Sequence, residues 1–440
     1  MSTQEKNHHL LYGKSGLSVS LPENCNANII RKRTMPIVEN PQQTIEAALE
    51  NAVASPSFKK AVHGKRTACI LICDITRPVP NGLFLPIMIR HLQAAGFVKE
   101  NITVLIATGL HRPNEDEEMR ELVGDPWVLD NATVVNHFAE DDAAHVLVGH
   151  TEKGTVVRLD RRFVEADVKV ATGLVEPHFM AGYSGGRKVI APGVAHAETI
   201  TTFHNATFMS HPKATNCVLE GNPLHEEQLE IVQMLGGALA LNTVIDENRN
   251  LAFVNFGEIV QSHLEAVDFI RSYAEVGVSK RFSTVITSSA GYPLDKTYYQ
   301  TVKGMVGPLG ILAPGGDLII VSECSEGLGS AHFRDAQRRL VHLGMDGFME
   351  SIEQKNHADI DEWQTQMQLK PMRLGNVYLY SDKLSAVDKS LTGVTCIDSV
   401  DAVVTESIKR QRSGDVAIIP EGPYVVPFFK ERKEKLTTLG

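Results

Sequence analysis

Cysteine is scarce in this 440-residue sequence, and the spacing of the cysteines excludes two kinds of structural site. The six cysteines contain no CxxC pair. A disulfide framework and a structural zinc knuckle are therefore not expected. Cys69 and Cys73 lie within or at the edge of an apolar run, residues 67–73, and we expect both to be buried in a strand.

Long apolar runs and a leader segment are also missing. The chain has no window of the ~18–20 apolar residues that a membrane-spanning helix needs. Residues 1–10 are polar and lack the charged and then apolar segments of a signal peptide. We therefore expect a soluble, cytoplasmic protein without a membrane partner.

Basic charge is in short supply. The chain has 43 Lys and Arg against 53 Asp and Glu, a formal net charge of −10, and no long basic stripe. This balance argues against nucleic acid as a partner. Small anionic substrates remain compatible with it, because a local pocket of Arg and Lys can operate inside an acidic shell. The sequence leaves open whether the chain forms a homo-oligomer.

Short apolar runs alternate with amphipathic stretches along the whole chain, and 43% of the residues are hydrophobic. This pattern predicts an α/β protein with two α/β domains, mainly parallel sheets and an active-site cleft between the domains. Strands are expected at residues 67–73, 101–107, 132–136, 167–174, 240–245, 251–256, 282–288, 316–322, 376–380 and 415–420.

A predicted helix over residues 258–276 separates two series of strands. We therefore place the first domain at residues 1–275 and the second at residues 276–412. The C-terminal residues, about 413–440, are a candidate to pack back on the first domain.

Polar residues follow the first two predicted strands, at the ends where open α/β sheets bind ligands. A capped turn explains Asp74 and Thr76 in the DITRP motif. It does not explain Arg77, whose guanidinium can hold a carboxylate or phosphate through two parallel hydrogen bonds. The next strand leads into TGLH, which ends at His111. A lone loop histidine is commonly structural, but the repeated arrangement of strand, turn and polar group favours a function.

Residues 176–188 (EPHFMAGYSGGRK) form the most informative stretch. Residues 182–186 match the G-x-S-x-G hydrolase elbow around Ser184, although His178 precedes the serine and Lys188 has no role in that chemistry. Alternatively, backbone amides of the glycine-rich loop hold a phosphate, assisted by Arg187 and Lys188. In a third interpretation, Lys188 bonds covalently to a cofactor. A turn with solvated basic residues is the structural alternative.

Two more groups complete the candidates. His204 lies near three other histidines, and imidazole suits Zn, Ni, Cu or Fe, but the spacings form no single-helix metal pair. In the second domain, Tyr299 and Lys303 share one helical face, with Gln300 beside them. These three side chains are either the solvated start of a helix or donors for an anionic ligand.

Together these segments resemble the nickel-dependent lactate racemase family, in order, from about residue 10 to the C-terminus. The matching residues are Asp74-x-Thr76-Arg77-Pro78, Thr108-Gly109-Leu110-His111, Pro177-His178, Gly182-x-Ser184-Gly185-Gly186-x-Lys188, His204 and Tyr299-Gln300-x2-Lys303-Gly304. The glycine-rich block from His178 to Lys188 is the most specific of them.

The resemblance implies that the first domain is catalytic and binds nickel together with pyridinium-3,5-bisthiocarboxylic acid mononucleotide, a nickel-pincer nucleotide. Lys188 matches the lysine joined to this cofactor, and His204 matches the nickel ligand, with His211 and His225 as rivals. Asp74, Ser184, Gly185 and Gly186 are assigned to the cofactor side. His111 and His178 match the acid–base pair, and Arg77, Tyr299, Gln300 and Lys303 match the substrate side. In this family separate proteins build the cofactor, and these would be partners of the chain.

The implied reaction inverts C2 of a small 2-hydroxyacid, lactate or a relative. The C2–H bond beside a carboxylate is a very weak acid, so its removal as hydride through a 2-ketoacid avoids a carbanion. Two acid–base groups with pKa values near neutrality then serve the two faces. A larger sugar acid or dicarboxylic 2-hydroxyacid is the alternative substrate, with Arg90 or Arg112 as a second carboxylate site. A non-catalytic anion- or nucleotide-binding module is the alternative of another class.

Overall fold

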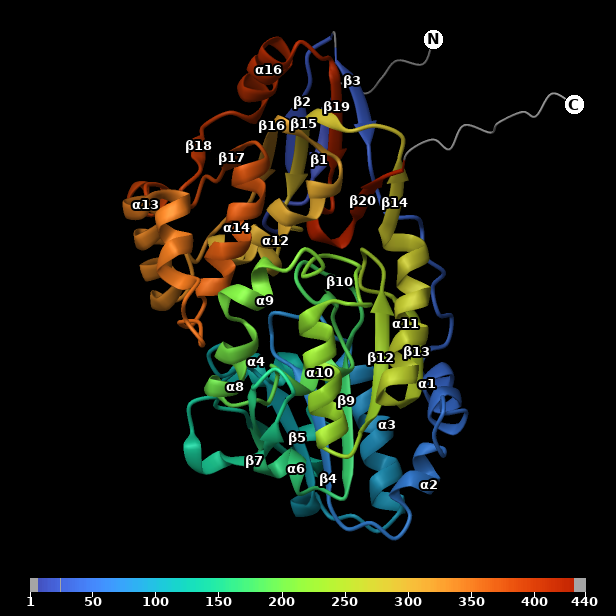
Figure 1. Ribbon diagram of the computed structural model, residues 1–440. Helices are drawn as coiled ribbons and strands as arrows, with labels where there is room; N and C mark the ends of the chain where they lie inside the picture. Colours follow the sequence, from blue (N-terminus) through green and yellow to red (C-terminus); the bar gives the residue numbers. More distant parts are fainter. Residues whose placement is uncertain (1–6, 24, 431–440) are drawn as a thin grey trace, which may run out of the picture. The chain divides into compact units, whose positions relative to one another are not determined.

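The computed structural model describes residues 7–23 and 25–430 (Figure 1). The chain divides into two compact units. The large unit consists of Thr34–Tyr273 and Ile352–Ile360, and the small unit consists, within the described residues, of 7–23, 25–33, Ala274–Ser351 and 361–430.

The large unit is built on a six-stranded sheet in the order β13-β12-β9-β4-β5-β6. Only β13 is antiparallel to its neighbour. The strands are β4 (Ala68–Cys73), β5 (Ile102–Ala107), β6 (Thr133–Asn136), β9 (Val168–Leu174), β12 (Leu239–Ile245) and β13 (Leu251–Glu258). From β4 the chain proceeds to β5 and β6 on one side, and β9 and β12 lie on the other. The order therefore reverses beside β4, where such sheets form a crevice outside their carboxyl ends.

The strands of this sheet carry apolar side chains on both faces, and helices cover these faces. Ile70, Ile72, Val104 and Ile106 are fully buried in one core cluster with residues of α1 to α5. The helices of the large unit are α1 (Pro41–Glu50), α2 (Phe58–Val62), α3 (Asn81–Ala94), α4 (Asp116–Val123), α5 (Trp127–Asn131), α6 (Arg161–Val164), α7 (Arg187–Ile190), α8 (Ala197–Phe203), α9 (Ala206–Ser210), α10 (Pro223–Met234) and α11 (Ile259–Ala274). A hairpin of β7 (His145–His150) and β8 (Val156–Asp160) adds to this unit, as do the short paired strands β10 (Pro177–His178) and β11 (Gly182–Tyr183).

The small unit has a second six-stranded sheet, in the order β18-β17-β16-β15-β19-β3, and all its pairs are parallel. Its strands are β3 (Asn26–Ile29), β15 (Phe282–Ser288), β16 (Leu312–Val321), β17 (Asn376–Tyr380), β18 (Thr395–Ile397) and β19 (Asp415–Ile419). Its helices are α12 (Tyr298–Val306), α13 (Ala331–Ile352), α14 (Glu362–Leu374), α15 (Ala386–Lys389) and α16 (Val400–Gln411). Two small ribbons pair β1 (Asn7–Leu10) with β2 (Leu17–Ser20) and β14 (Glu275–Val278) with β20 (Val426–Phe429).

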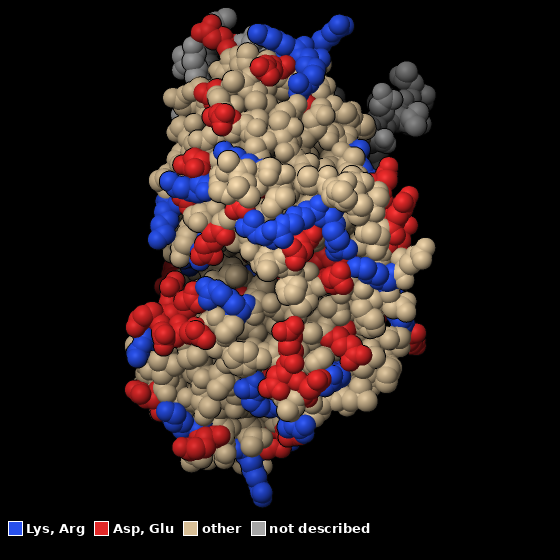
Figure 2. Space-filling model, turned by 90° about the vertical axis from the view of Figure 1, so that its left-hand side faces the viewer, with Lys and Arg blue, Asp and Glu red and all other residues tan. Residues whose placement is uncertain are grey.

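The ten strands expected from the sequence are all present, with shifts of a few residues at their ends, and the fold class of mixed α/β with mainly parallel sheets is confirmed. The expectation for the cysteines holds in part, since Cys69 is buried whereas Cys73 is only partly buried at the end of its strand. All six lie within the described residues as free thiols, and Cys69 and Cys73 belong to β4. Among these described residues no helix combines the length and the apolar character of a membrane span. Acidic and basic groups are interspersed over the face shown in Figure 2.

The expected division of the chain needs a correction in three segments. Residues 413–430 belong to the small unit and not to the first domain, since β19 inserts between β15 and β3. The final residues of the predicted tail, 431–440, lie outside the described residues. Residues 7–23 and 25–33 also belong to the small unit, where Asn26 Nδ2 donates to Asp415 Oδ1 at 2.7 Å. Ile352–Ile360, in contrast, belongs to the large unit.

Candidate active site

The turn after β4 carries a buried carboxylate, that of Asp74. Its Oδ1 accepts from Thr76 Oγ1 at 2.7 Å, and its Oδ2 accepts from His111 Nδ1 at 2.7 Å. Burial alone would raise the pKa of Asp74, but His111, Thr76 and Arg77 together hold it below its ordinary value. The simple capping interpretation of this turn is therefore wrong, since the Asp74 side chain binds a histidine, and Pro78 does not open α3.

The turn after β5 presents His111. Its backbone is closed by a hydrogen bond from His111 N to Thr108 O (2.9 Å), and Gly109, at φ +55°, donates its N–H to Gly193 O. The His111 side chain is 42% exposed. Because Nδ1 of the neutral ring donates its proton to Asp74, the basic nitrogen is Nε2.

His178 is buried in the short β10–β11 ribbon. Its Nδ1 accepts from the backbone amides of Ala181 (3.2 Å) and Met180 (3.4 Å). Gly182, at φ +77°, allows this tight return, since a Cβ there would lie 2.3 Å from Val218 O. The ring is thus oriented by the backbone of its own loop, and the proton of the neutral ring lies on Nε2.

The next residues, Ser184 to Gly186, hold the loop against β9 and α11. Ser184 Oγ donates to Leu174 O at 2.8 Å and accepts from Glu176 N at 3.1 Å. Gly186, at φ +50°, packs where a Cβ would lie 2.8 Å from the His263 ring. The Ser184 hydroxyl is used by backbone groups, which speaks against the hydrolase interpretation.

Arg187 and Lys188 differ in role. Arg187 is buried and donates to Ala181 O (3.0 Å) and Tyr183 O (3.2 Å), so it folds its own loop and is not solvated. Lys188 has a pKa lowered to about 7 by burial and by the charges of Arg77 and Arg187. The charge of Asp74 acts on Lys188, and the charge of Lys188 acts on His204.

Glu176 is a site residue that the sequence interpretation missed. It forms an ion pair with Arg77, and both side chains are mostly buried. This pair joins the turn after β4 to the loop that carries His178. The available signal was its position directly before Pro177-His178 at the end of a predicted strand.

His204 ends α8, and burial lowers its pKa to about 3. Its Nδ1 donates to Ile200 O at 2.9 Å, so Nε2 is the nitrogen without a proton in the neutral ring, the form that can bind a metal. The rivals lie in other settings. His211 is exposed and accepts from Lys213 N (3.2 Å), and His225, whose pKa burial lowers to about 3, feels the charge of Arg187.

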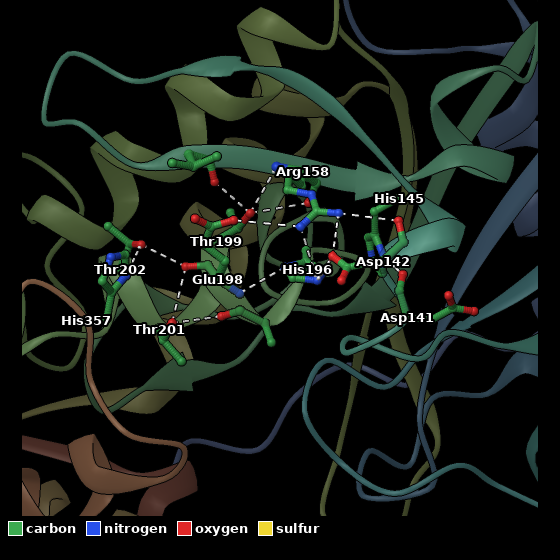
Figure 3. A network of polar contacts seen from close by, with 12 residues as sticks. Asp141, Asp142, His145, Arg158, His196, Glu198, Thr199, Thr201, Thr202 and His357 are labelled. Atoms are coloured by element: carbon green, nitrogen blue, oxygen red, sulfur yellow. Dashed lines mark hydrogen bonds and ion pairs between the residues drawn. The ribbon is translucent and has the colours of Figure 1, made fainter.

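The segment Ile352–Ile360 braces the end of α8, which the sequence did not predict. His357 Nδ1 lies 2.9 Å from Thr202 Oγ1, as Figure 3 shows, and Ala358 N donates to Thr201 O at 3.0 Å. Asn205 Nδ2 donates to Asn356 O at 2.9 Å. A segment more than 150 residues away therefore supports the helix that ends at His204.

The three remaining predicted residues lie on α12 of the small unit. Burial and then the Asp361 carboxylate raise the pKa of Tyr299 well above its ordinary value. Gln300 is buried, and among the described residues its Oε1 has no hydrogen-bond partner. Lys303 is half-buried one turn further along. The structure thus gathers the other nine candidates in the large unit and these three in the small unit.

Comparison with known proteins covers nearly the whole chain. The lactate racemase N-terminal domain model matches residues 12–216, and the lactate racemase C-terminal domain model matches residues 278–426. A lactate racemase of Thermoanaerobacterium thermosaccharolyticum is 31% identical over 96% of this chain and 99% of its own. A lactate racemase of Lactiplantibacillus plantarum is 32% identical over 66% of this chain and 68% of its own.

Solved structures agree. The lactate racemase apoprotein of T. thermosaccharolyticum matches with a TM-score of 0.87 and 29% identity, over 96% of this chain and 99% of that one. A Thermotoga maritima protein shares the fold, with a TM-score of 0.66 and 18% identity, over 90% and 99% of the chains. The chain therefore belongs to the lactate racemase family and is an isomerase of the racemase type.

Proposed function

We propose that this racemase interconverts the enantiomers of lactate or a close 2-hydroxyacid in the cytoplasm, through a 2-ketoacid, with a nickel-pincer nucleotide bound at Lys188. The observation that carries the proposal is a desolvated lysine amine, with a pKa of about 7, within the electrostatic reach of Asp74, Arg77 and His204. The two homologous lactate racemases support the choice of substrate.

The residues present fit the cofactor. An amine that is neutral near pH 7 is suited to an amide-type bond, and burial beside Arg77 and Arg187 keeps Lys188 in that form. His204 is neutral, and its Nδ1–H is held by Ile200 O, the arrangement that prepares Nε2 as a metal ligand. When bound, the nickel-pincer group supplies an acceptor and donor of hydride. Proteins that build this cofactor would be partners of the chain.

The two histidines move the hydroxyl proton. Nε2 of His111 accepts it, and the carboxylate of Asp74 stabilises the imidazolium that forms. His178 directs its Nε2–H toward an oxygen on the other side of the substrate, and the Met180 and Ala181 amides hold the ring. Each ring therefore serves one face of a planar ketoacid.

Positioning of the substrate carboxylate is assigned to cations. Arg77 is fixed by Glu176, which limits the freedom of its guanidinium before the substrate arrives. Tyr299, Gln300 and Lys303 are proposed as further contacts to the substrate.

The alternative of a dicarboxylic or larger sugar-acid substrate is less well supported. Arg112 makes two hydrogen bonds to the Glu118 carboxylate at 2.6 Å, and Arg90 stacks 4.8 Å from the centre of the Trp127 ring. Both cations already have partners, so neither is set aside for a second carboxylate.

The test is production of the chain together with the cofactor-building proteins of a known lactate racemase, followed by intact mass, nickel content and peptide mapping. We expect a mononucleotide-sized adduct on Lys188 and nickel in proportion to it. Lys188→Ala should lose both. Lys169→Ala is the matched control, since that half-buried lysine on the same sheet donates to Ala166 O and should leave the adduct intact. An unmodified, nickel-free protein under these conditions would refute the proposal.

A further inference from the structure

Three buried histidines outside the proposed reacting groups form a continuous row in the large unit, which we call the histidine row. His137 follows β6, His145 begins β7 and His196 precedes α8, and their exposures are 1%, 4% and 9%. Nε2 of His137 and Nε2 of His145 are 3.0 Å apart, and their rings meet edge to face. The His145 and His196 rings also meet edge to face, with centres 5.0 Å apart, and Figure 3 shows the two side by side.

One end of the histidine row, His137, contacts the turn that carries His111. His137 N donates to Ile106 O at 3.1 Å, and Thr108 Oγ1 donates to His137 O at 2.8 Å. Thr108 Oγ1 also lies 3.2 Å from His137 Nδ1. Because Thr108 O accepts the N–H of His111, His137 supports the backbone from which the acid–base histidine projects.

The other end reaches the helix of His204. His196 is the N-cap of α8, and its Nδ1 accepts from Glu198 N at 3.1 Å. Its backbone N–H donates to Arg158 O at 2.9 Å. The helix is two turns long and ends at His204, so the cap at one end sets the position of the imidazole at the other.

The hydrogen bonds determine where each proton lies. The Asp141 carbonyl accepts from His145 Nδ1 at 2.7 Å, so His145 Nε2 accepts and His137 Nε2 donates. In His196, Nδ1 accepts and Nε2 faces Asp142 Oδ1 at 3.3 Å. The surrounding charges are largely paired with one another, Arg158 with Asp142 and Glu198, and Arg162 with Asp160. His145 and His196 therefore each have to be neutral to accept these hydrogen bonds, and burial lowers the pKa of His137 to about 3.

We propose that His137, His145 and His196 are positioning residues that couple the turn of His111 to helix α8, and so keep the acid–base histidine and the nickel ligand in a fixed relation. The inference rests on the proposed function for the roles of His111 and His204. The coupling itself is a property of the unloaded chain and can be measured without the cofactor.

Hydrogen exchange of the unloaded full-length protein tests the coupling. His196→Ala removes the cap, so the amides of α8 should exchange about fivefold faster. If the histidine row transmits the loss of the cap, the amides of residues 106–112 should also exchange faster, although the substitution does not touch them. Faster exchange confined to α8 would overturn the proposal.

A conservative variant and a variant at the opposite end sharpen this test. His196→Asn keeps an oxygen acceptor for Glu198 N and should restore slow exchange in α8, whereas residues 106–112 should stay fast, because the ring contact with His145 is still missing. Thr108→Val, which is nearly isosteric, should accelerate exchange in residues 197–204, and it serves if His196→Ala does not fold. No change in residues 197–204 with Thr108→Val would also count against the coupling.

The loaded enzyme gives a second readout. His196→Ala should lower kcat and nickel retention by about fivefold or more and change KM less than twofold. Nickel retention should recover in His196→Asn, whereas kcat should stay low because the ring contact with His145 is still missing. Coupled exchange in a protein that takes up no cofactor would refute the proposed function and leave the coupling intact. Normal cofactor loading and turnover without coupled exchange would refute the coupling and leave the proposed function intact.

Discussion

The turn that carries His111 and the turn that carries His178 hold their imidazoles by different means. His111 is half exposed and donates Nδ1–H to the carboxylate of Asp74. His178 is buried, and its Nδ1 faces two backbone N–H groups. A carboxylate stabilises an imidazolium, whereas N–H groups directed at Nδ1 oppose a proton there. The pair is therefore asymmetric, and His111 is the ring better suited to carry the additional proton.

A racemase nevertheless has to work in both directions. To accept a proton on Nε2, His178 needs the Nδ1–H tautomer, which displaces the two amide hydrogen bonds. These bonds are long, at 3.2 and 3.4 Å, and hydrogen bonds of this length are weak. The loop thus orients His178 without binding it firmly in one protonation state.

The largest expected effect comes from removing the rings. His111→Ala and His178→Ala should each lower kcat about 10³-fold, since general acid–base groups contribute roughly 10²–10⁴-fold. The double variant should be little worse than either single variant, because the two act as a unit. Racemisation rates from each enantiomer, normalised to nickel content, measure this. If the loss of kcat in the double variant equalled the product of the two single losses, the two histidines would act independently.

Direction gives an internal control on that result. The two enantiomers have equal free energies in water, so kcat/KM has to fall by the same factor from either side. The individual kcat values are free to differ, and unequal kcat values in a single variant would locate the asymmetry in the bound states.

Asp74→Asn tests the carboxylate that distinguishes the two turns. Loss of the charge beside His111 should lower kcat about 10²-fold and shift the pH profile of kcat, while loading at Lys188 remains measurable by mass. Rates that are unaffected by Asp74→Asn would mean that the asymmetry has no catalytic role.

Asp74 also makes a prediction about stability. Because its folded pKa is depressed, it stabilises the fold at pH values above the unfolded pKa of about 3.9, and this stability is lost as the pH falls through the folded pKa. Urea midpoints of the unloaded protein should therefore decline less between pH 5 and pH 3 in Asp74→Asn than in the parent. Equal declines would contradict the proposed His111–Asp74 interaction.

Gly182→Ala tests the backbone that orients His178. The new methyl group would lie 2.3 Å from Val218 O at a positive φ, so we expect a loss of about 2–3 kcal/mol of stability and a disordered His178 loop. Gly154→Ala is the matched control, since its φ is +87° with no atom within 4 Å and it should cost about 1 kcal/mol. Similar losses in thermal unfolding would show that the close approach at Gly182 is unimportant.

The smallest effects concern the substrate carboxylate. Lys303→Ala should raise KM about tenfold, the value of one charge-assisted hydrogen bond. Arg112→Ala should change KM less than twofold and stability less than about 0.5 kcal/mol, because its ion pair with Glu118 is exposed. A large increase in KM for a dicarboxylic 2-hydroxyacid with Arg112→Ala would favour the alternative substrate.

Prediction from the sequence succeeded where local signals are strong. Apolar runs such as Ala68–Cys73 are bounded by polar turns, and this pattern is typical of a strand that is buried on both faces. The turns after β4, β5 and β9 follow for the same reason. Short strands such as β3, with the sequence NANI, have no such pattern and depend on pairing with distant β19.

The contacts that define the site could not be predicted from the sequence, because they also join segments that are distant along the chain. The ion pair of Arg77 with Glu176 and the bond of Asp74 to His111 join residues 99 and 37 positions apart. Nothing in either local sequence specifies the partner. The match of residues 182–186 to the hydrolase elbow shows the converse, since the motif is present while the Ser184 hydroxyl holds the ends of the loop.

The return of Ile352–Ile360 to the large unit has a consequence for synthesis of the chain. A ribosome has to add 84 residues beyond Tyr273 before His357 can meet Thr202. Helix α8 and His204 would thus lack their brace on any nascent chain, or any fragment, that ends before residue 360. Maturation of the proposed nickel site is then tied to synthesis of this late segment, and cutting the chain near residue 276 would not yield a finished large unit.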